Sequence, residues 1–405
     1  MRNCIIAQSG GPTSVINSSV VGLLKANTKL KKYDKIYGGL NGIEGILNEN
    51  IIELSSIDDN DIETFKYTPS SGLGSCRYKM KNADKSTEEY DKLIEILNKL
   101  EIKTFFYIGG NDSMDTTAKL GKYAKENSLD ISFIGIPKTI DNDLMYTDHT
   151  PGFGSAAKFI ATTTLETYLD ASVYTNNGIF ILETMGRDTG WLAASACMAT
   201  YNGKPVADFI YLPEKPFDTA DFLQDVRKKF EEQNQVFIVV SEGIRTAEGK
   251  FLSEMACSAQ DTFGHAQLGG VCQYLKNAIL DAGITNRVKA LELGVLQRCA
   301  MHCASQTDIN EALEAGAKAL ELASSETNGH MICFNRTSND PYTISYDLVE
   351  ASKVANNVKY FPTEWINEKG NHITYEGIKY FKPLIEGVPT LYTYNNIPQY
   401  KVFTK

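Results

Sequence analysis

Two stretches of this chain end in residue types that suit phosphate chemistry. The first runs from Thr104 to Ser113 and ends in Gly-Gly-Asn-Asp-Ser; the second runs from Ile134 to Asp143 and ends in Lys-Thr-Ile-Asp-Asn-Asp. Each begins as a short apolar run, which predicts a buried strand of a parallel sheet, and open α/β sheets bind ligands at the ends of such strands. If the two strands are neighbours, their ends bring together glycines, one ammonium group and several carboxylates. That set suits a phosphate, a divalent metal ion and a general base.

A glycine turn near the start of the chain has the sequence of a phosphate site. The apolar strand Cys4–Gln8 leads into Ser-Gly-Gly-Pro-Thr, and an amphipathic helix follows. Strand, glycine turn and helix place backbone N–H groups and a helix N-terminus against a phosphate. Strand-to-helix turns also need glycines for steric reasons, so Gly10 and Gly11 alone leave both interpretations open.

A second glycine loop, Ser71–Tyr78, carries a single cation, Arg77. Either Arg77 is solvated on a surface loop, or it reaches the same phosphate pocket as the first turn. The residues Ser-Thr-Glu-Glu that begin at Ser86 predict a capping box for a helix leading into the Thr104 strand.

Strands and helices alternate along the chain, which predicts an α/β fold with mainly parallel sheets. Further strands are expected at residues 178–184, 208–212, 235–240 and 330–334, and a helix at 311–323. Residues 288–296 lead to Gln297 and Arg298. Residues from Tyr346 onward are aromatic and fit no regular pattern.

Composition excludes several classes of function. The net charge of −10, without a Lys/Arg run, argues against non-specific nucleic-acid binding, and the longest apolar runs are too short to span a bilayer. The start of the chain has no signal-peptide pattern, and the eight cysteines form no paired framework, so we expect a cytoplasmic protein with reduced thiols. Cys299, His302 and Cys303 lack a second ligand pair, which disfavours zinc.

Five motifs in one order resemble the 6-phosphofructokinase family, and more closely its pyrophosphate-dependent branch. They are the glycine pair at 10–11, Gly-Gly-Asn-Asp-Ser at 109–113, Pro-Lys-Thr-Ile-Asp-Asn-Asp at 137–143, Met-Gly-Arg at 185–187 and Leu-Gly-Val-Leu-Gln-Arg at 293–298. The resemblance runs to about residue 310 and implies two Rossmann-like α/β domains with the active site in the cleft between them. Residues 1–150 plus about 297–335 are expected to bind the donor, and residues 151–296 the acceptor. Residues 336–405 are expected to pack on both as a C-terminal segment.

The resemblance implies transfer of a phosphoryl group from pyrophosphate to the 1-hydroxyl of fructose 6-phosphate, reversibly and with Mg²⁺. In this role Asp141 is the base, and Asp143 and Thr139 orient it and the sugar. A lone Asp-Asn-Asp would more simply cap a helix. The implied donor-binding residues are Gly10, Gly11, Arg77, Gly110 and Ser113.

Donor choice depends on two positions. Relatives that use ATP typically have glycine where this chain has Asp112, whose carboxylate would repel the α-phosphate of a nucleotide. They usually also have glycine where this chain has Lys138, whose ammonium group can stabilise the transferring phosphoryl group and the leaving phosphate. Alternatively, Asp112 caps the following helix and Lys138 is solvated. Asn111 stands where the family commonly has its metal-associated aspartate, so Asp112 is expected to take more of the metal role.

The resemblance also implies the acceptor site. Its residues are Thr139, Ile140, Asp141, Met185, Gly186, Arg187, Glu242, Lys289, Val295 and Arg298, the last on the 6-phosphate. Relatives commonly have arginine where this chain has Lys289 and Gly178, and histidine or tyrosine in place of Val295. Lys158, Arg287 or Arg336 are candidates to supply the missing charge.

Two rival functions remain on the same fold. One is an ATP-dependent 6-phosphofructokinase, and the other is a non-catalytic regulatory subunit. The family completes its acceptor pocket with residues of a neighbouring subunit, which implies a homodimer or homotetramer.

Overall fold

The computed structural model describes residues 2–255 and 270–403, which divide into two compact units. Unit 1 comprises Met1–Ser155, Arg298–Val358 and Ile385–Lys405, and unit 2 comprises Ala156–Gln297 and Lys359–Leu384. The domain boundaries expected at 150 and about 297 lie close to these divisions. Of residues 336–405, those at 336–358 and 385–405 belong to unit 1 and those at 359–384 to unit 2.

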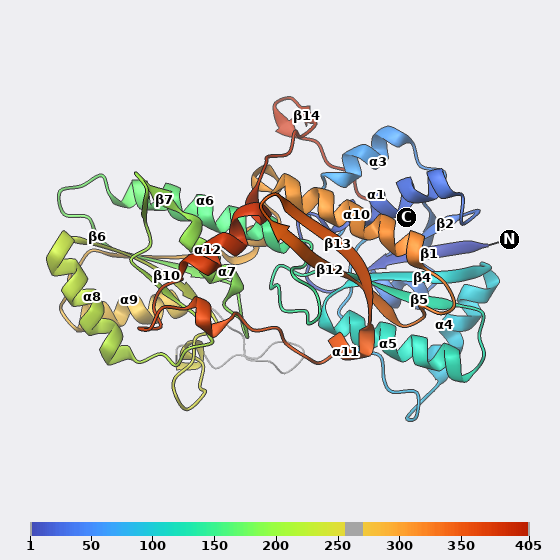
Figure 1. Ribbon diagram of the computed structural model, residues 1–405, viewed down its shortest axis with the longest axis horizontal. Helices are drawn as coiled ribbons and strands as arrows, with labels where there is room; N and C mark the ends of the chain where they lie inside the picture. Colours follow the sequence, from blue (N-terminus) through green and yellow to red (C-terminus); the bar gives the residue numbers. More distant parts are fainter. Residues whose placement is uncertain (1, 256–269, 404–405) are drawn as a thin grey trace. The chain divides into compact units, whose positions relative to one another are not determined.

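Unit 1 is built on a seven-stranded sheet of order β13-β12-β5-β4-β1-β2-β3 (Figure 1). Its strands are β1 (Asn3–Gln8), β2 (Ile36–Gly39), β3 (Ile51–Glu53), β4 (Ile102–Gly109), β5 (Ser132–Pro137), β12 (His330–Asn339) and β13 (Tyr342–Glu350). The five central strands are parallel, and the edge strands β3 and β13 are antiparallel to their neighbours. Gly109 at the end of β4 lies in register with Pro137 at the end of β5. The expected adjacency of these two strand ends is therefore confirmed.

Helices cover both faces of this sheet (Figure 1). One face carries α1 (Ile16–Leu30), α3 (Asp59–Lys66) and α10 (Gln306–Leu322), and the other carries α2 (Gly42–Leu47), α4 (Glu88–Lys99) and α5 (Asn111–Glu126). Successive strand residues alternate between the two cores: Ile6 and Phe106 pack toward α1, whereas Ile5 and Phe105 pack toward α4. A sheet covered on both faces needs such uninterrupted apolar strands.

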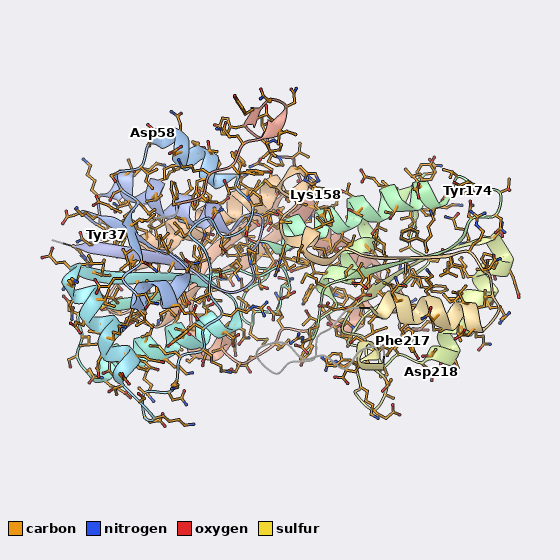
Figure 2. The ribbon with its side chains drawn as sticks, turned by 180° about the vertical axis from the view of Figure 1, so that it is seen from behind. Tyr37, Asp58, Lys158, Tyr174, Phe217 and Asp218 are labelled. Carbon is orange, nitrogen blue, oxygen red and sulfur yellow. The ribbon has the colours of Figure 1, made fainter. Side chains whose placement is uncertain are left out.

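Unit 2 is built on a four-stranded parallel sheet of order β11-β6-β10-β9. Its strands are β6 (Gly178–Thr184), β9 (Phe209–Tyr211), β10 (Gln235–Ser241) and β11 (Val288–Glu292). One face packs against α8 (Thr219–Gln233) and α9 (Val271–Asp281), and the other against α6 (Phe153–Ala171) and α7 (Trp191–Ala194). Asp218 lies at the start of α8 (Figure 2). It caps this helix by accepting hydrogen bonds from the N–H groups of Ala220 and Asp221.

Short elements complete the chain. The α-helices are α11 (Ala351–Val354) and α12 (Tyr375–Phe381), and the 3₁₀ helices are Ser195–Met198, Leu252–Met255, Gly294–Arg298, Met301–Cys303, Thr363–Trp365 and Lys382–Ile385. Two small hairpins are formed by β7 (Thr200–Tyr201) with β8 (Lys204–Pro205) and by β14 (Thr393–Tyr394) with β15 (Ile397–Pro398).

The structure differs from the sequence-based expectation at three places. The capping box at Ser86 is wrong, because α4 begins at Glu88 and its cap residue Thr87 makes no side-chain capping bond. The strand expected to end at residue 334 continues to Asn339 and pairs with β13, a strand that the sequence pattern did not predict. The helix expected at 311–323 begins five residues earlier, at Gln306.

The aromatic residues near the C-terminus form a cluster within unit 2. The ring of Trp191 lies 5.0 Å from that of Phe361, 6.2 Å from that of Trp365 and 5.2 Å from that of Tyr380. Lys359–Leu384 thus belongs to the core of unit 2 although it follows β13 of unit 1 in the chain. In residues 2–255 and 270–403, no helix is both long and apolar enough to cross a membrane.

Candidate active site

Lys138 directly follows β5, and its side chain is buried against the glycine turn that follows β1. Its Nζ donates a hydrogen bond to the carbonyl oxygen of Gly11 at 2.7 Å. Burial lowers the pKa of Lys138 to about 8, although the carboxylates of Asp141 and Asp143 oppose this shift. The alternative of a solvated Lys138 is excluded. A bound anion here would favour the charged form of this ammonium group.

The loop after Lys138 holds Asp141 at the edge of the sheet. The Thr139 hydroxyl donates to Asp141 Oδ2 at 3.1 Å and accepts from the Asp141 N–H at 3.1 Å. Asn142 takes a positive φ of 56°, which asparagine tolerates better than most residues, and its side chain is fully buried. No helix begins at this loop, and α6 starts only at Phe153, so the helix-cap alternative for Asp141 is excluded.

The buried amide of Asn142 ties this loop to the segment that follows it. Asn142 Oδ1 accepts from the Thr150 N–H at 3.1 Å, and the Thr150 hydroxyl donates to the Thr139 carbonyl oxygen at 2.7 Å. Ile140 is buried beside them. The conformation of the Asp141 loop therefore depends on Thr150.

The glycine loop Ser71–Tyr78 lies on the Gly10–Gly11 turn. The Gly10 N–H donates to the Cys76 carbonyl oxygen at 2.9 Å, and the Ser75 hydroxyl donates to the Gly10 carbonyl oxygen at 2.7 Å. Gly10 has a φ of 75°, and a Cβ there would lie 3.2 Å from Lys138 Nζ. Arg77 is exposed on this loop and helps to lower the pKa of Lys138, so its charge acts at the glycine turn.

The first turn of α5 brings four of the predicted residues together. Gly110 is the cap residue, without a side-chain capping bond, so Asp112 does not cap this helix. Asp112 is exposed in the first turn, whereas Ser113 is buried with its hydroxyl against Gly109. Both amide atoms of Asn111 bond to the backbone: Oδ1 accepts from the Asn356 N–H at 2.5 Å, and Nδ2 donates to the Asn357 carbonyl oxygen at 2.6 Å.

Arg298 lies beside the donor turn, in unit 1. Its Nη1 would lie 3.1 Å from a Cβ at Gly11, and its charge lowers the pKa of Lys138. This places a third cation, with Arg77 and Lys138, around the Gly10–Gly11 turn. The predicted contact of Arg298 with the 6-phosphate stays a prediction.

In unit 2, the Met-Gly-Arg turn after β6 lies against the residues that follow β10. The Met185 N–H donates to Gln297 Oε1 at 3.2 Å, and the Gly186 N–H donates to Glu242 Oε1 at 3.2 Å. The Arg187 carbonyl oxygen accepts from Arg245 Nη2 at 3.2 Å. Met185, Gly186, Arg187 and Glu242 are thus neighbours, as a shared sugar site requires, and their individual roles stay predictions.

The other cation positions of the acceptor site have different surroundings. Gly178 has a φ of 85°, and a Cβ there would lie 2.3 Å from the Arg287 carbonyl oxygen, so an arginine does not fit. Lys289 is exposed on β11, with Nζ 3.3 Å from Asp170 Oδ2, and Val295 is 57% exposed. The guanidinium of Arg287 lies over the ring of Tyr174, 4.9 Å from its centre.

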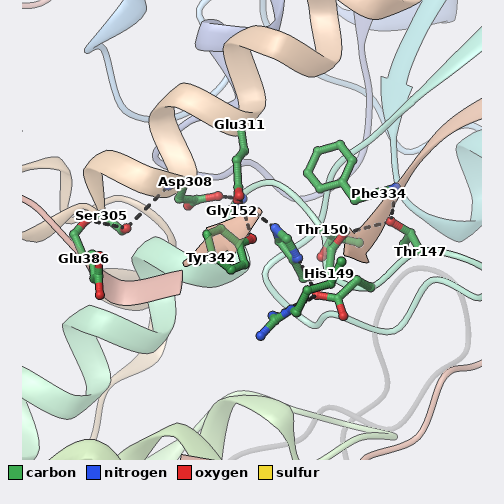
Figure 3. Close-up of polar contacts among 12 residues, drawn as sticks. Thr147, His149, Thr150, Gly152, Ser305, Asp308, Glu311, Phe334, Tyr342 and Glu386 are labelled. Carbon is green, nitrogen blue, oxygen red and sulfur yellow. Dashed lines mark hydrogen bonds and ion pairs between the residues drawn. The ribbon is translucent and has the colours of Figure 1, made fainter. Parts of the chain in front are cut away.

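A buried polar network supports the segment that follows the Asp141 loop (Figure 3). The His149 ring bonds through Nδ1 to Asp148 Oδ1 at 2.8 Å and through Nε2 to Glu311 Oε2 at 2.7 Å. Glu311 Oε1 accepts from the Tyr342 hydroxyl at 2.7 Å, and Asp148 Oδ1 accepts from Arg336 Nη2 at 2.8 Å. Arg336 is therefore paired within unit 1, and its contribution to the acceptor pocket stays a prediction.

Asp308 completes this support from α10. Its carboxylate accepts from the N–H groups of Gly152 at 2.8 Å and Ser155 at 2.9 Å, and burial raises its pKa to about 6. Thr139 forms an isolated parallel bridge with Gly152. The Asp141 loop is thus attached to α10 and to β12–β13 through residues 147–155.

Sequence reasoning assigned no role to His149, Thr150, Asp308 or Glu311. The only local signal was Asp148 beside His149 and Thr150, five residues after the Asp141 loop ends. Glu311 is 162 residues from its partner His149, and Arg336 is 188 residues from its partner Asp148, so the network becomes visible only in the fold.

Comparisons with known proteins agree on one family. The phosphofructokinase family model matches residues 3–323. The pyrophosphate–fructose 6-phosphate 1-phosphotransferase of Halomonas elongata is 39% identical over 95% of this chain and 92% of its own, and the protein of the same name from Xanthomonas campestris pv. campestris is 39% identical over 98% and 95%. The crystal structure of the pyrophosphate-dependent phosphofructokinase from Nitrosospira multiformis has a TM-score of 0.87 at 36% identity, covering 98% of this chain and 95% of that one.

The His149 network predicts a pH-dependent stability. Burial alone would lower the pKa of His149, but Glu311 and Asp148 outweigh burial and raise it to about 9. A histidine whose pKa is raised on folding stabilises the fold below its unfolded value of about 6.5, and this contribution is lost as the pH rises through about 9. His149→Gln should therefore lower the free energy of unfolding by about 3 kcal/mol at pH 6, and thermal unfolding by circular dichroism should show a loss of roughly 5 °C.

The double variant His149→Gln with Glu311→Gln is the matched test of the charge argument. It removes the carboxylate that the first substitution leaves buried without its imidazolium, so it should recover part of the lost stability. A single variant with the wild-type unfolding temperature at both pH 6 and pH 9 would contradict a charged His149.

Proposed function

The chain belongs to the phosphofructokinase family, and on that premise we propose that it transfers a phosphoryl group from pyrophosphate to the 1-hydroxyl of fructose 6-phosphate. The products are fructose 1,6-bisphosphate and phosphate. The reaction is reversible, because the free energies of hydrolysis of pyrophosphate and of the new phosphate ester are similar. One observation supports the pyrophosphate assignment above all: the buried ammonium group of Lys138 faces the glycine turn, and Asp112 stands exposed at the first turn of the neighbouring α5.

Asp141 acts as the general base. Its carboxylate accepts the proton of the 1-hydroxyl as the hydroxyl oxygen attacks the terminal phosphorus of pyrophosphate. The bond from that phosphorus to the bridging oxygen breaks, and phosphate leaves with the bonding electrons. The hydrogen bond from Thr139 holds the Asp141 carboxylate in a fixed orientation before the substrates bind.

Lys138 stabilises the charge that develops on the transferring phosphoryl group and on the leaving phosphate. Because the side chain is buried, its interaction with an anion is screened less than at the surface. Arg77 lies at the same turn and adds positive charge for the donor. The backbone of Gly10, Gly11 and Gly110 allows the donor to approach closely. The Ser113 hydroxyl packs against Gly109 and supports the turn between β4 and α5.

Asp112 selects the smaller donor. An exposed carboxylate at the first turn of α5 leaves pyrophosphate room at the glycine turn but repels a further phosphate of a nucleotide. The same carboxylate suits Mg²⁺, since a hard cation takes oxygen ligands. We infer that Asp112 would hold the metal, because the Asn111 oxygen already accepts the Asn356 N–H. Bound Mg²⁺ neutralises charge on the donor oxygens.

The sugar of the acceptor is assigned to the Met185–Arg187 turn and Glu242. Its 6-phosphate is assigned to Arg298 and Lys289, with Val295 beside them in the acceptor site. A homodimer or homotetramer would complete this site with residues of a second subunit. Assembly and a cytoplasmic location both stay predictions.

A donor competition tests the assignment. With fructose 6-phosphate and Mg²⁺ present, the wild-type protein should turn over pyrophosphate about a hundredfold faster than ATP at equal concentration, because a repulsion of about 3 kcal/mol between Asp112 and the nucleotide gives that ratio. Asp112→Gly should raise the rate with ATP, and Asp112→Gly with Lys138→Gly should raise it further while the rate with pyrophosphate collapses. Initial rates of fructose 1,6-bisphosphate formation measure both donors.

Asp59→Gly is the matched control, because Asp59 has the same charge in the first turn of another helix, α3. It should leave the ratio of the two rates unchanged. A clear preference of the wild-type protein for ATP would show that ATP, not pyrophosphate, is the donor. No turnover with either donor would favour a non-catalytic regulatory subunit.

Asp141→Ser should lower turnover by roughly three orders of magnitude, as expected when a general base is removed. Unfolding temperature should stay within a few degrees of wild type, because the carboxylate is half-buried at a loop and its loss leaves the Asn142–Thr150 bond in place. Steady-state kinetics and thermal unfolding on the same sample separate the two effects. Turnover close to that of wild type would exclude Asp141 as the base.

A further inference from the structure

Asn111 holds a segment that leads directly from one unit to the other. We call residues 355–361 the crossing segment, because the chain leaves unit 1 after Val358 and enters unit 2 at Lys359. Within unit 1, both amide atoms of Asn111 bond to this segment, at 2.5 Å to the Asn356 N–H and at 2.6 Å to the Asn357 carbonyl oxygen. Asn356 also donates from Nδ2 to Asp115, one turn further along α5, at 3.2 Å.

The bonds of Asn111 require an amide. One atom must accept a hydrogen bond and the other must donate one, and only an amide side chain of this length does both. An aspartate would place a second acceptor against the Asn357 carbonyl oxygen. The chain therefore has a structural reason for asparagine at a position next to the proposed metal-binding Asp112.

The crossing segment is anchored again on the other side of Val358, within unit 2. The Lys359 carbonyl oxygen accepts from Trp191 Nε1 at 2.9 Å, and the Lys359 ammonium lies 5.1 Å from the centre of the Trp191 ring. The Phe361 N–H donates to Glu214 Oε1 at 2.8 Å, and Glu214 Oε1 also accepts the Gly190 N–H at 2.9 Å. Trp191 and Phe361 are both buried.

Only Val358 separates the two anchored carbonyl groups, those of Asn357 and Lys359. Consecutive Cα atoms are about 3.8 Å apart, so the chain between the anchors has little slack. The link from the first turn of α5 to Trp191 therefore contains no loop between the two anchors. In unit 2, Trp191 begins the helix that follows the Met185–Arg187 turn.

We propose that Asn111 is a positioning residue that clamps the crossing segment to the donor-binding end of α5, so that binding of the inorganic donor is transmitted along the chain to Trp191. The coupling rests on the proposed function, because it takes pyrophosphate as the ligand at α5. The clamp itself does not depend on any ligand. Asn111 thus contributes to the reaction through Asn356 and Asn357 and does not bind the metal.

Hydrogen exchange measured by mass spectrometry tests the clamp without ligand. Asn111→Asp keeps the acceptor but removes the donor, so exchange of peptides that cover residues 355–361 should rise about tenfold. Asn127→Asp is the matched control at the other end of α5, where Asn127 Nδ2 donates to the Tyr123 carbonyl oxygen at 2.9 Å. It should leave the crossing segment unchanged. Equal exchange in wild type and Asn111→Asp would overturn the clamp.

Tryptophan fluorescence tests the coupling. The chain has two tryptophans, and Trp365→Phe leaves Trp191 as the only emitter. Pyrophosphate with Mg²⁺ should change the emission of Trp191 in this background, and Asn111→Asp should remove at least half of the change at saturating donor. Calorimetry on the same proteins measures donor binding independently.

The outcomes separate the two proposals. If pyrophosphate binds and the emission of Trp191 does not change, or changes equally in Asn111→Asp, the coupling is wrong and the proposed function stands. If calorimetry detects no binding of pyrophosphate to the wild-type protein, the proposed function and the coupling both fail, and the exchange experiment still decides the clamp.

Discussion

The hydrogen bond from the buried ammonium group of Lys138 to Gly11 is the interaction on which the site depends. It exists because β1, β4 and β5 are parallel neighbours, so the segments that follow them emerge at one edge of the sheet. A protein with a net charge of −10 attracts a polyanion only where positive charge is gathered locally. Here Lys138, Arg77 and Arg298 supply it around one glycine turn, and the strands hold that turn rigid.

Local patterns predicted the parts of the site that follow single strands. The ends of β4 and β5 were found from apolar runs that stop at glycine or lysine, and the fold agrees with both. The supporting contacts from distant segments could not be predicted from the sequence. Glu311, Arg336 and Tyr342 join the His149 network only through the packing of α10 and β12–β13. The C-terminal aromatic residues were unassigned for a similar reason. Their pattern reflects packing around Trp191, not the period of a helix or a strand.

Two departures from the family pattern have a backbone cause. Gly178 stands where an arginine is common, and its positive φ and the approach of the Arg287 carbonyl oxygen exclude any side chain. Asn111 stands where an aspartate is common, and its two bonds to the Asn356–Asn357 backbone use both ends of an amide. In both cases a change that looks like lost chemistry in the sequence reflects a requirement of the main chain.

The discontinuous composition of unit 1 has a consequence for synthesis on the ribosome. Strand β5 can pair with β4 once both have left the ribosome, but its other neighbour β12 and the helix α10 that covers α1 come from residues 306–339. During translation of all of Ala156–Gln297, the nascent first unit therefore carries an open strand edge and an uncovered apolar helix face. Chaperone binding in the cell should concentrate on ribosomes that hold this intermediate.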